Sequence, residues 1–550
     1  MIRIANGLIV DGTGKAAFRG DIVLEKDRIA AVEPMAPDAP PAAGPDVVDA
    51  AGCVVTPGFV DAHSHSDAYL VLEPDAPSKL SQGVTTEVNG QCGGSVVPRY
   101  GEARLSGDWA TLLGERLTWR SLAEYRAVLE TSRPAINTVQ FVGHNTLRSS
   151  VIGYAGVRAT PDTLAAMQKL LARELDDGGW GLTTGLIYQP GKYSDAAEVV
   201  ALAKTAAEHG GLYATHMRSE SDRILEAIDE VLDLVRATGI RAEISHLKTS
   251  GRRNWDKIDA VLDKMQTAVD DGLLLGSDRY PFCAAGTDLD IVLPDWAQEG
   301  AAAAECRRLA DPATRAKMSA EIDASDRDWA SVMIGGTWSD FTRPMSGRSV
   351  ADIRAHAADF GLPPDISAGD LICRILEADR CLTGGFFFGM SERNLRLILE
   401  RPWIVPGSDA SLRAPWGPLG KDHPHPRAYG TMPAFFRLMT GRDTFADGGR
   451  LSFGLEETVA RMTAIPARRF GLRGRGVLER GAFADIAIWR PDEFRNVSTY
   501  EQPHAFCTGM KRVYVNGALA YADGAFTHAG TGHFLERCTA FSDRRMRVNQ

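Results

Sequence analysis

Residues 56–67 read Thr-Pro-Gly-Phe-Val-Asp-Ala-His-Ser-His-Ser-Asp. This stretch places two histidines, separated by one serine, at the end of an apolar, strand-like run. Side chains two residues apart in an extended segment point the same way, so His63 and His65 can face one metal ion. A His-x-His pair alone is a weak signal, because such short motifs also arise by chance. The pair gains meaning only if other ligand-type residues follow further strands in the same way.

Outward from this motif, strand-like runs alternate with stretches of helical periodicity, a pattern typical of a parallel sheet covered by helices. Repeated eight times, it predicts an α/β protein built on a (β/α)8 barrel. The eight runs are Val55–Val60, Thr85–Val88, Thr138–Val142, Gly181–Thr184, Leu212–Thr215, Ala242–Ser245, Leu273–Gly276 and Trp403–Pro406.

The two ends of the chain differ from the middle, with short alternating runs and turn signals such as Asn516-Gly517. Because chain ends often lie close in space, we expect residues 1–56 and 469–533 to form one small β-sandwich. The barrel would take residues 57–468, including an insertion at about 288–400 between strands seven and eight that covers its mouth. Residues 534–550, with an Arg-rich end, would be a solvated tail.

Ligand-type residues recur at the C-terminal ends of these predicted strands, where barrel enzymes place their catalytic groups. Six such residues at one end of a barrel would rarely meet there by accident. Thiolate and imidazole are suitable ligands for zinc, so the pattern predicts a zinc site. His63 and His65 follow strand one, and Cys92 follows strand two. The other ligand-type residues follow strands five, six and eight and are His216, His246 and Asp409.

Longer motifs resemble those of known proteins. Residues 56–67 resemble the first-strand motif of the amidohydrolase superfamily, and Gly-Val-Thr-Thr-Glu-Val-Asn-Gly-Gln-Cys-Gly (83–93) is similar to that of the D-aminoacylase family of N-acyl-D-amino-acid deacylases. The resemblance covers roughly residues 1–532 apart from the insertion, and it implies zinc-dependent hydrolysis of N-acyl-D-amino acids. Further matching motifs lie at residues 214–220, 244–248, 278–281, 407–410, 425–431 and 484–485.

The resemblance also implies roles for the ligand-type residues. Cys92 would replace the carboxylated lysine that many amidohydrolases carry after strand four, where this chain has Gly-Leu-Thr-Thr-Gly-Leu (181–186). Asp409 would act as general base and acid besides binding metal, although alone it would also suit a helix N-cap. The implied zinc positions are a tight one formed by Cys92, His216 and His246, and a weaker one formed by His63, His65, Asp409 and Cys92.

An N-acyl amino acid also carries a free carboxylate, which needs cationic or hydrogen-bonding partners. Without the family pattern, the residues at the matching positions would be interpreted as surface cations or packed tyrosines. Among the departures from the family that bear on the substrate, Gly286 stands where the family commonly has a serine; the segment 409–427 and the insertion are also longer than usual. The implied substrate-binding residues are Tyr188, Lys248, Tyr280, Thr287 and Arg427.

Bulk properties exclude other classes of function. A net charge of −10 argues against nucleic acid as a partner, and no apolar run approaches the ~20 residues of a membrane span. The N-terminus lacks a signal-peptide core and eight cysteines are scattered without a disulfide pattern, so we expect a cytoplasmic protein with a small-molecule substrate.

Two alternatives to the hydrolysis of N-acyl-D-amino acids stay open. One is an amide hydrolase acting on a cyclic amide or another acylated amine. The other is a non-catalytic scaffold, which would typically have lost ligands.

Overall fold

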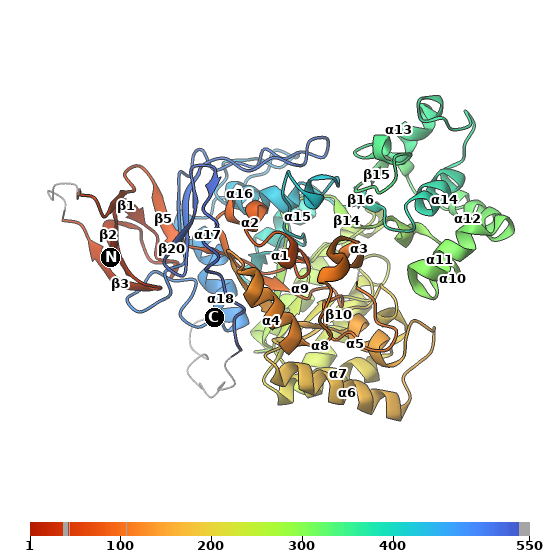
Figure 1. Ribbon diagram of the computed structural model, residues 1–550, viewed down its shortest axis with the longest axis horizontal. Helices are drawn as coiled ribbons and strands as arrows, with labels where there is room; N and C mark the ends of the chain where they lie inside the picture. Colours follow the sequence, from red (N-terminus) through yellow and green to blue (C-terminus); the bar gives the residue numbers. More distant parts are fainter. Residues whose placement is uncertain (37–41, 43, 106, 538–550) are drawn as a thin grey trace.

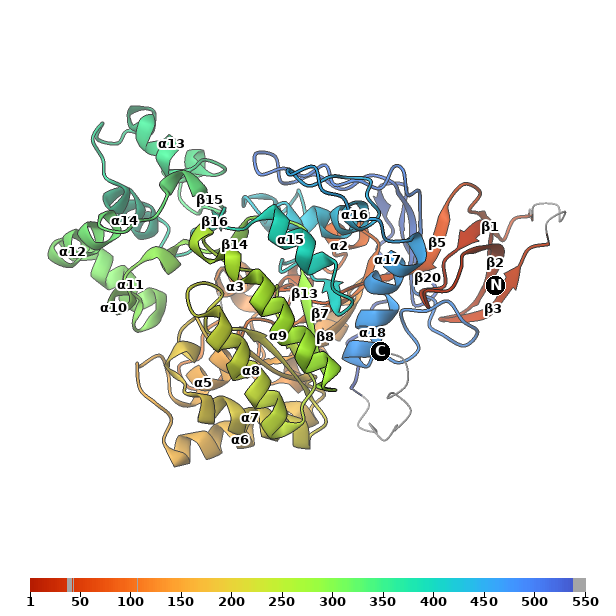
Figure 2. The ribbon, with the colours of Figure 1, turned by 180° about the vertical axis from the view of Figure 1, so that it is seen from behind.

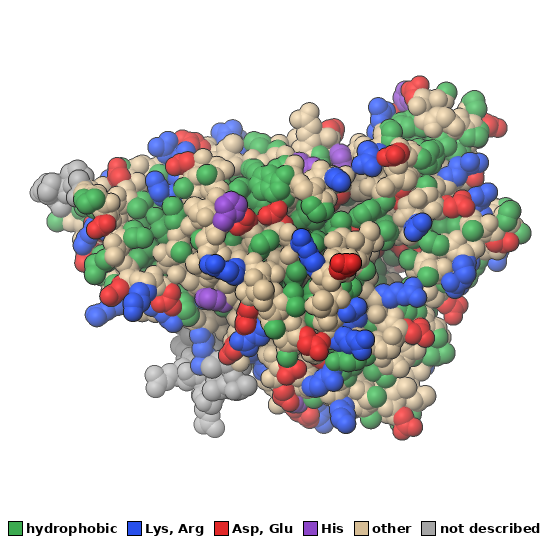
Figure 3. Space-filling view, in the orientation of Figure 1, with side chains coloured by type: hydrophobic (Ala, Val, Ile, Leu, Met, Phe, Trp, Pro, Cys, Tyr) green, Lys and Arg blue, Asp and Glu red, His purple; other side chains and the backbone are tan. Residues whose placement is uncertain are grey.

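The computed structural model describes residues 1–36, 42, 44–105 and 107–537. A β-rich end, a central α/β region and a mostly helical lobe follow one another along the longest axis of the molecule (Figure 1). Charged side chains of both signs are interspersed over the face seen in Figure 3. The described cysteines are free, whereas Cys538 and the Arg-rich end of the predicted tail lie outside the described residues.

Strands from both ends of the chain form one nine-stranded sheet, with β4 paired to β1 beside the order β21-β20-β19-β18-β5-β1-β2-β3. Antiparallel pairing of β5 (Val54–Pro57) with β18 (Ile486–Trp489) joins the two halves. The two ends of the chain therefore share one β-structure, and its description as a sandwich stays a prediction. The other strands are β1 (Ile2–Ile9), β2 (Phe18–Glu25), β3 (Arg28–Pro34), β4 (Val47–Asp49), β19 (Met510–Val515), β20 (Ala518–Ala522) and β21 (Ala525–Phe526).

Two parallel sheets, ordered β6-β7-β8 and β17-β13-β12-β11-β10-β9, form the central region. Only Phe141 separates β8 (Asn137–Gln140) from β9 (Val142–Gly143). At the opposite edges of the two sheets, the backbone N–H of Asp409 donates to the carbonyl of His63 at 2.8 Å. The segments that follow β17 and β6 therefore also meet. The other strands are β6 (Phe59–Asp61), β7 (Val84–Asn89), β10 (Gly181–Gly185), β11 (Leu212–His216), β12 (Ala242–Ile244), β13 (Leu275–Arg279) and β17 (Ile404–Pro406).

Amphipathic helices cover the outside of these strands and bury their apolar faces. The first, α6, begins where Thr160 accepts a hydrogen bond from the N–H of Thr163 and Pro161 occupies the first turn. Neighbouring helices of this layer lie side by side in Figure 2, and they contact one another in chain order. The helices of this layer are α6 (Pro161–Asp176), α7 (Ala196–Glu208), α8 (Ile224–Thr238) and α9 (Ile258–Asp270).

Two predicted strands are each divided in the structure. The run 55–60 is wrong as one strand, because β5 belongs to the terminal sheet and β6 to the parallel one. Gly58 lies between them, where a Cβ atom would fall 2.1 Å from Oγ1 of Thr85. The run 138–142 divides at Phe141 into β8 and β9. An apolar run alone does not show at which residue the chain leaves one sheet for another.

The lobe between β13 and β17 has a sheet and an apolar core of its own. Its three strands are ordered β14-β16-β15, and its core is distinct from the main one. Among the described residues, no helix combines the length and apolar character needed to cross a membrane. The main elements are β14 (Ala285–Asp288), β15 (Val332–Ile334), β16 (Gly384–Phe387), α11 (Ala301–Ala310), α12 (Pro312–Asp323), α13 (Val350–Ala355) and α14 (Ala368–Ala378).

Candidate metal centre

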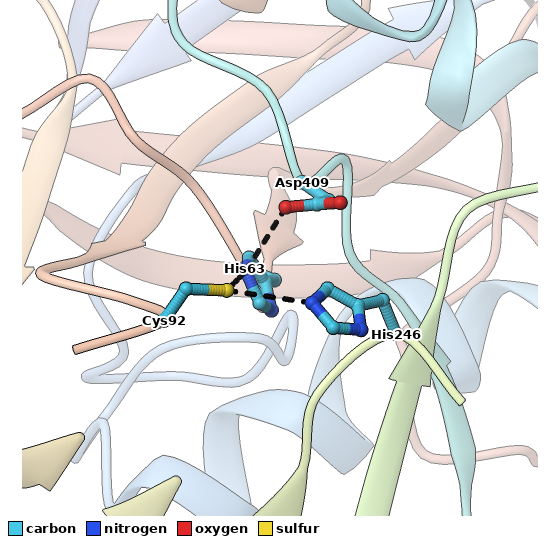
Figure 4. A group of neighbouring side chains, drawn as sticks. All are labelled: His63, Cys92, His246 and Asp409. Carbon is cyan, nitrogen blue, oxygen red and sulfur yellow. Dashed lines mark hydrogen bonds and ion pairs between the residues drawn. The ribbon is translucent and has the colours of Figure 1, made fainter. Parts of the chain in front are cut away.

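Four side chains from four different strand ends converge on one point (Figure 4). Ligand atoms of His63, Cys92, His246 and Asp409 all lie within 4.8 Å of one another. Sγ of Cys92 is 3.4 Å from Nε2 of His63 and 3.4 Å from Nε2 of His246. Nε2 of His63 is in turn 3.3 Å from Oδ1 of Asp409. Strand ends β6, β7, β12 and β17 therefore bring sulfur, nitrogen and oxygen donors together, as the sequence predicted.

The remaining two predicted ligands lie at the edge of this group. Nε2 of His65 is 3.1 Å from Oδ1 of Asp409. The ring of His216, at the end of β11, has its centroid 4.5 Å from that of His246. Together with Glu220, these two imidazoles form a second set of donor atoms within 4.8 Å. All six residues singled out in the sequence thus belong to one cluster.

Three of the cluster residues have left-handed backbone conformations. The φ angles are +53° at Cys92, +37° at His246 and +49° at Asp409. Such conformations are costly for residues other than glycine and persist only where the surrounding structure holds them. The turns that follow β7, β12 and β17 are therefore held in place so that the three side chains face one another.

A buried carboxylate and a buried lysine fix the loops behind the cluster. Asp61 accepts hydrogen bonds from the N–H groups of His63 (3.3 Å) and Ser408 (2.8 Å). Nζ of Lys79 donates to Asp61 at 2.7 Å and to the carbonyl of Ala410 at 2.9 Å. Asp61 is 1% exposed and Lys79 fully buried, so this network ties the segment after β6 to the segment after β17.

A second carboxylate, Asp278 on β13, supports two of the histidines. Its Oδ2 lies 3.1 Å from Nδ1 of His63, and its Oδ1 accepts the backbone N–H of His246 at 2.9 Å. The contact with Nδ1 orients the His63 ring with Nε2 toward Cys92. Carboxylates behind metal-binding histidines commonly have this function.

The cluster concentrates opposite charges in a buried place. Burial opposes ionisation of Cys92, but the imidazoles of His63 and His246 outweigh it and hold the thiol pKa well below its usual range. Burial is likewise outweighed at Asp409, whose pKa is held low by Arg427 and neighbouring imidazoles. At His216 burial is outweighed by Glu220 and the thiol, which raise the pKa to about 9. Anionic donors thus lie against cationic imidazoles, whose protons a metal ion would replace.

The donor set fits a bound metal such as zinc. Thiolate, imidazole and carboxylate groups are its usual ligands. Both ring nitrogens of His216 are buried and lack a hydrogen-bond partner among the described residues, although buried ring nitrogens normally have one. A ligand on one of these nitrogens would satisfy it, so His216 is suited to metal binding.

The cluster lies in a large cavity beside the helical lobe. The cavity measures about 1480 Å³, and four of the five predicted substrate-binding residues line it: Tyr188, Lys248, Thr287 and Arg427. The hydroxyls of Tyr188 and Thr287 lie 3.2 Å apart. Tyr280 is fully buried, with its ring centroid 4.7 Å from Cζ of Arg427. Tyr280 therefore supports Arg427 from behind.

Sequence reasoning missed the residues that hold the ligands in place. Glu220 and Asp278 occur in motifs that were recognised and Lys79 lies between two of them, yet no role was assigned to any of the three. Glu220 follows His216 by four residues, and a carboxylate at that spacing was the one available signal. It contacts His246 Nδ1 at 2.9 Å and Lys248 Nζ at 2.6 Å.

Comparison with known proteins agrees with this geometry. The chain matches the model of the amidohydrolase family over residues 46–521. It is 33% identical to N-acyl-D-glutamate deacylase of Alcaligenes xylosoxydans xylosoxydans, over 97% of this chain and 96% of that protein. It is 31% identical to D-aminoacylase of the same organism, over 98% of both chains.

Solved structures give the same result. A D-aminoacylase described with a binuclear metal centre has a TM-score of 0.78 at 30% identity, covering 98% of this chain and 99% of that one. N-acyl-D-glutamate deacylase from Bordetella bronchiseptica, complexed with zinc and a phosphonate mimic of the tetrahedral intermediate, has a TM-score of 0.78 at 32% identity and the same coverage. This protein therefore belongs to the amidohydrolase family, in the group of D-aminoacylase and its relatives.

Proposed function

We propose that this protein hydrolyses the amide bond of N-acyl-D-amino acids with the help of zinc, releasing a carboxylate and a D-amino acid. The observation that carries the proposal is the cluster of Cys92, His246 and Asp409 in one cavity with the cations Lys248 and Arg427. The relatives named N-acyl-D-glutamate deacylase, D-aminoacylase and N-acyl-D-aspartate deacylase support it.

The proposed architecture is a (β/α)8 barrel of residues 57–468 with an insertion at about 288–400, and a β-sandwich of residues 1–56 and 469–533. The predicted tail does not begin at residue 534, because Phe534 and Arg537 are buried. The short step from β8 to β9 and the bond between Asp409 and His63 support closure of the two parallel sheets into one barrel. Their strand ends would then surround the metal centre, the usual place of a barrel active site.

Zinc would be held tightly by Cys92, His216 and His246, and a second, weaker position would use His63, His65, Asp409 and Cys92. When bound, zinc supplies Lewis-acid chemistry, polarising an amide carbonyl and making water a better nucleophile at neutral pH. The zinc in the solved relative from Bordetella bronchiseptica supports this choice of metal.

Asp409 would move the proton. Its low pKa keeps the carboxylate ionised at neutral pH, so Oδ1, which faces His63 and His65, can accept a proton from water. The same oxygen would then donate the proton to the leaving nitrogen. Arg427 contacts the other oxygen, Oδ2, at 2.8 Å and fixes the orientation of the carboxylate.

The substrate carboxylate would bind to Lys248 and Arg427, with hydroxyl donors at Tyr188 and Thr287 and with Tyr280 holding Arg427. Burial and the nearby Cys92 raise the pKa of Tyr188 well above its usual range, so its hydroxyl stays protonated and donates. Residues of β14 and β16 line the same cavity, so the lobe limits the access of bulk water.

The test is hydrolysis of a panel of matched N-acetyl-D- and N-acetyl-L-amino acids by zinc-loaded wild type and Cys92→Ala. Turnover of D-substrates that the variant loses would support both the site and the substrate class. Zinc-dependent turnover of cyclic amides alone would retain the metal centre and reject the substrate. A fully metallated protein without activity on either class would favour a non-catalytic scaffold.

A further inference from the structure

Glu220 is a buried carboxylate that contacts three side chains of the site and has no part in the mechanism above. Its Oε1 lies 2.6 Å from Nζ of Lys248 and 2.9 Å from Nδ1 of His246. Its Oε2 lies 3.4 Å from Nε2 of His216. The carbonyl of Glu220 also accepts the N–H of Ser250 at 2.7 Å, which anchors the residue. One side chain therefore connects two metal-binding histidines with one substrate-binding lysine.

The contacts from Glu220 determine which ring nitrogens remain for a metal. A neutral imidazole has one N–H and one lone pair, and a carboxylate can only accept. If His246 donates from Nδ1 to Glu220, its lone pair is on Nε2, which faces Cys92 at 3.4 Å. Both ring nitrogens of His216 are buried without a hydrogen-bond partner among the described residues, and Nε2 faces Glu220 at 3.4 Å, so a proton held on Nε2 leaves the lone pair on Nδ1. Glu220 thus favours the metal-binding tautomer of both rings.

Lys248 competes with Glu220 for the same nitrogen of His246. Its Nζ lies 2.9 Å from Nδ1 of His246, the atom that also faces Glu220. An ammonium group only donates, so a hydrogen bond from Lys248 requires the lone pair on Nδ1. The N–H of His246 would then be on Nε2, directed at Cys92. The two hydrogen bonds to Nδ1 therefore exclude each other.

We propose that Glu220 is a positioning residue that couples metal binding to recognition of the substrate carboxylate. A metal on Nε2 of His246 requires N–H on Nδ1, which Glu220 accepts and Lys248 cannot contact favourably. Lys248 then loses one of its two side-chain partners, and its ammonium group becomes free to donate to an anion in the cavity. The inference rests on the proposed function for the identity of that anion, an N-acyl amino acid.

The metal and the substrate carboxylate both favour the arrangement with N–H on Nδ1 of His246. Each must therefore raise the protein's affinity for the other by the same factor. A carboxylate that draws Lys248 away from His246 favours the metal-binding tautomer. Loss of Lys248 should act in the same direction, so Lys248→Met is expected to bind zinc about three- to tenfold more tightly. If Lys248 acted through its charge alone, this gain would be no larger in the absence of Glu220, its ion-pair partner at 2.6 Å.

The experiment measures zinc affinity of metal-stripped protein by competition with a chelator, so it needs no enzymatic activity. The variants are Glu220→Gln, Lys248→Met and the double variant, with Glu230→Gln as a matched control because Glu230 is half-buried and pairs with Arg218. Glu220→Gln should weaken zinc binding about 10–100-fold. Glu230→Gln should bind zinc like wild type.

The double variant is decisive. If Glu220 and Lys248 compete at His246, their effects on zinc affinity are non-additive, and the gain from Lys248→Met is larger in the Glu220→Gln background, where no carboxylate opposes the hydrogen bond from Lys248. Additive effects, or unchanged zinc affinity in Glu220→Gln, would overturn the proposal. If Glu220→Gln does not fold, weaker zinc binding by Lys248→Met would overturn it as well.

A second readout separates this inference from the proposed function. In cobalt-loaded protein, the visible spectrum reports the ligand geometry, and Glu220→Gln should change it whereas Glu230→Gln should not. An unchanged spectrum in Glu220→Gln would contradict the positioning role. If no N-acyl-D-amino acid is hydrolysed while the affinities follow the expected pattern, the proposed substrate fails and the role of Glu220 stands.

Discussion

Nη1 of Arg427 lies 2.8 Å from Oδ2 of Asp409, so the two oxygens of this carboxylate have different partners. Oδ1 faces the imidazoles of His63 and His65, whereas Oδ2 faces the guanidinium. Nη2 of Arg427 also donates to the carbonyl of Gly286 at 3.1 Å. Arg427 therefore links the residue assigned to proton transfer with the strand β14 of the lobe.

Asp409→Asn should reduce kcat by about 10²–10⁴-fold, because an amide cannot accept the proton from water. The measurement is kcat at matched zinc content, with circular dichroism as a check on folding. Asp443→Asn is the control, since Asp443 is a partly exposed aspartate that pairs with Arg437 rather than with a residue of the cluster. A variant Asp409→Asn that keeps more than a tenth of wild-type kcat would exclude this residue as the base.

Arg427→Lys should raise KM for the D-substrate by about tenfold or more, since one ammonium cannot replace a guanidinium that contacts both Asp409 and a carboxylate. The kcat should fall as well, because Asp409 loses its orienting partner. Arg437→Lys on the same helix, α16 (Arg427–Met439), is the control. Steady-state kinetics of both variants with one substrate test this, and an unchanged KM would remove Arg427 from substrate binding.

Gly286→Ser should lower KM several-fold without affecting stability. A Cβ atom at this position would meet Nη2 of Arg427 at 3.4 Å, an ordinary contact, so the substitution fits. The added hydroxyl would offer the substrate carboxylate another donor. The change in unfolding free energy should stay within about 0.5 kcal/mol. A rise in KM would indicate that the hydroxyl competes for Arg427 instead.

Removal of zinc should lower the melting temperature of the wild type. A ligand present at 100 times its dissociation constant stabilises the folded state by about 2.7 kcal/mol. Thermal unfolding is measured with and without a chelator, and added zinc should restore the wild-type value. Cys92→Ala, which lacks the sulfur ligand, should respond much less to either treatment. An equal response of the two proteins would place the stabilising zinc elsewhere.

Glu305→Gln should make the protein less sensitive to alkaline pH. Burial in the lobe raises the pKa of Glu305 to about 7, from 4.5 for the free side chain. The folded state thus binds this proton more tightly than the unfolded chain. Its contribution to stability is therefore complete below pH 4.5 and is lost as the pH rises through 7.

Urea unfolding at pH 5 and pH 8 checks this expectation. Between the two pH values, the free energy of unfolding of the wild type should fall by about 1–3 kcal/mol more than that of Glu305→Gln. Glu321→Gln, which changes a more exposed carboxylate of the same lobe, should behave like the wild type. Equal losses in Glu305→Gln and wild type would show that Glu305 titrates normally in the folded protein.

Sequence patterns predicted the features that depend on periodicity and ligand chemistry. Helices α6 to α9 separate parallel strands, as the alternation of strand-like and helical runs predicted, and the ligand-type residues meet because parallel strands end at one edge. Glu220 was missed because it lies in a loop, where no periodicity indicates the direction of a side chain. Asp278 was missed because β13 is buried on both faces, so alternation carries no information there.

The pairing of β5 with β18 has a consequence for synthesis on the ribosome. The partners Pro57 and Ile486 lie more than 400 residues apart in the chain. At typical translation rates the N-terminal strands must wait for roughly 20–90 s before β18 emerges. During that time the edge of β5 is unpaired, and exposed edges are where nascent chains associate wrongly. The terminal sheet is thus the last part of the molecule to be completed, after the metal ligands have all been translated.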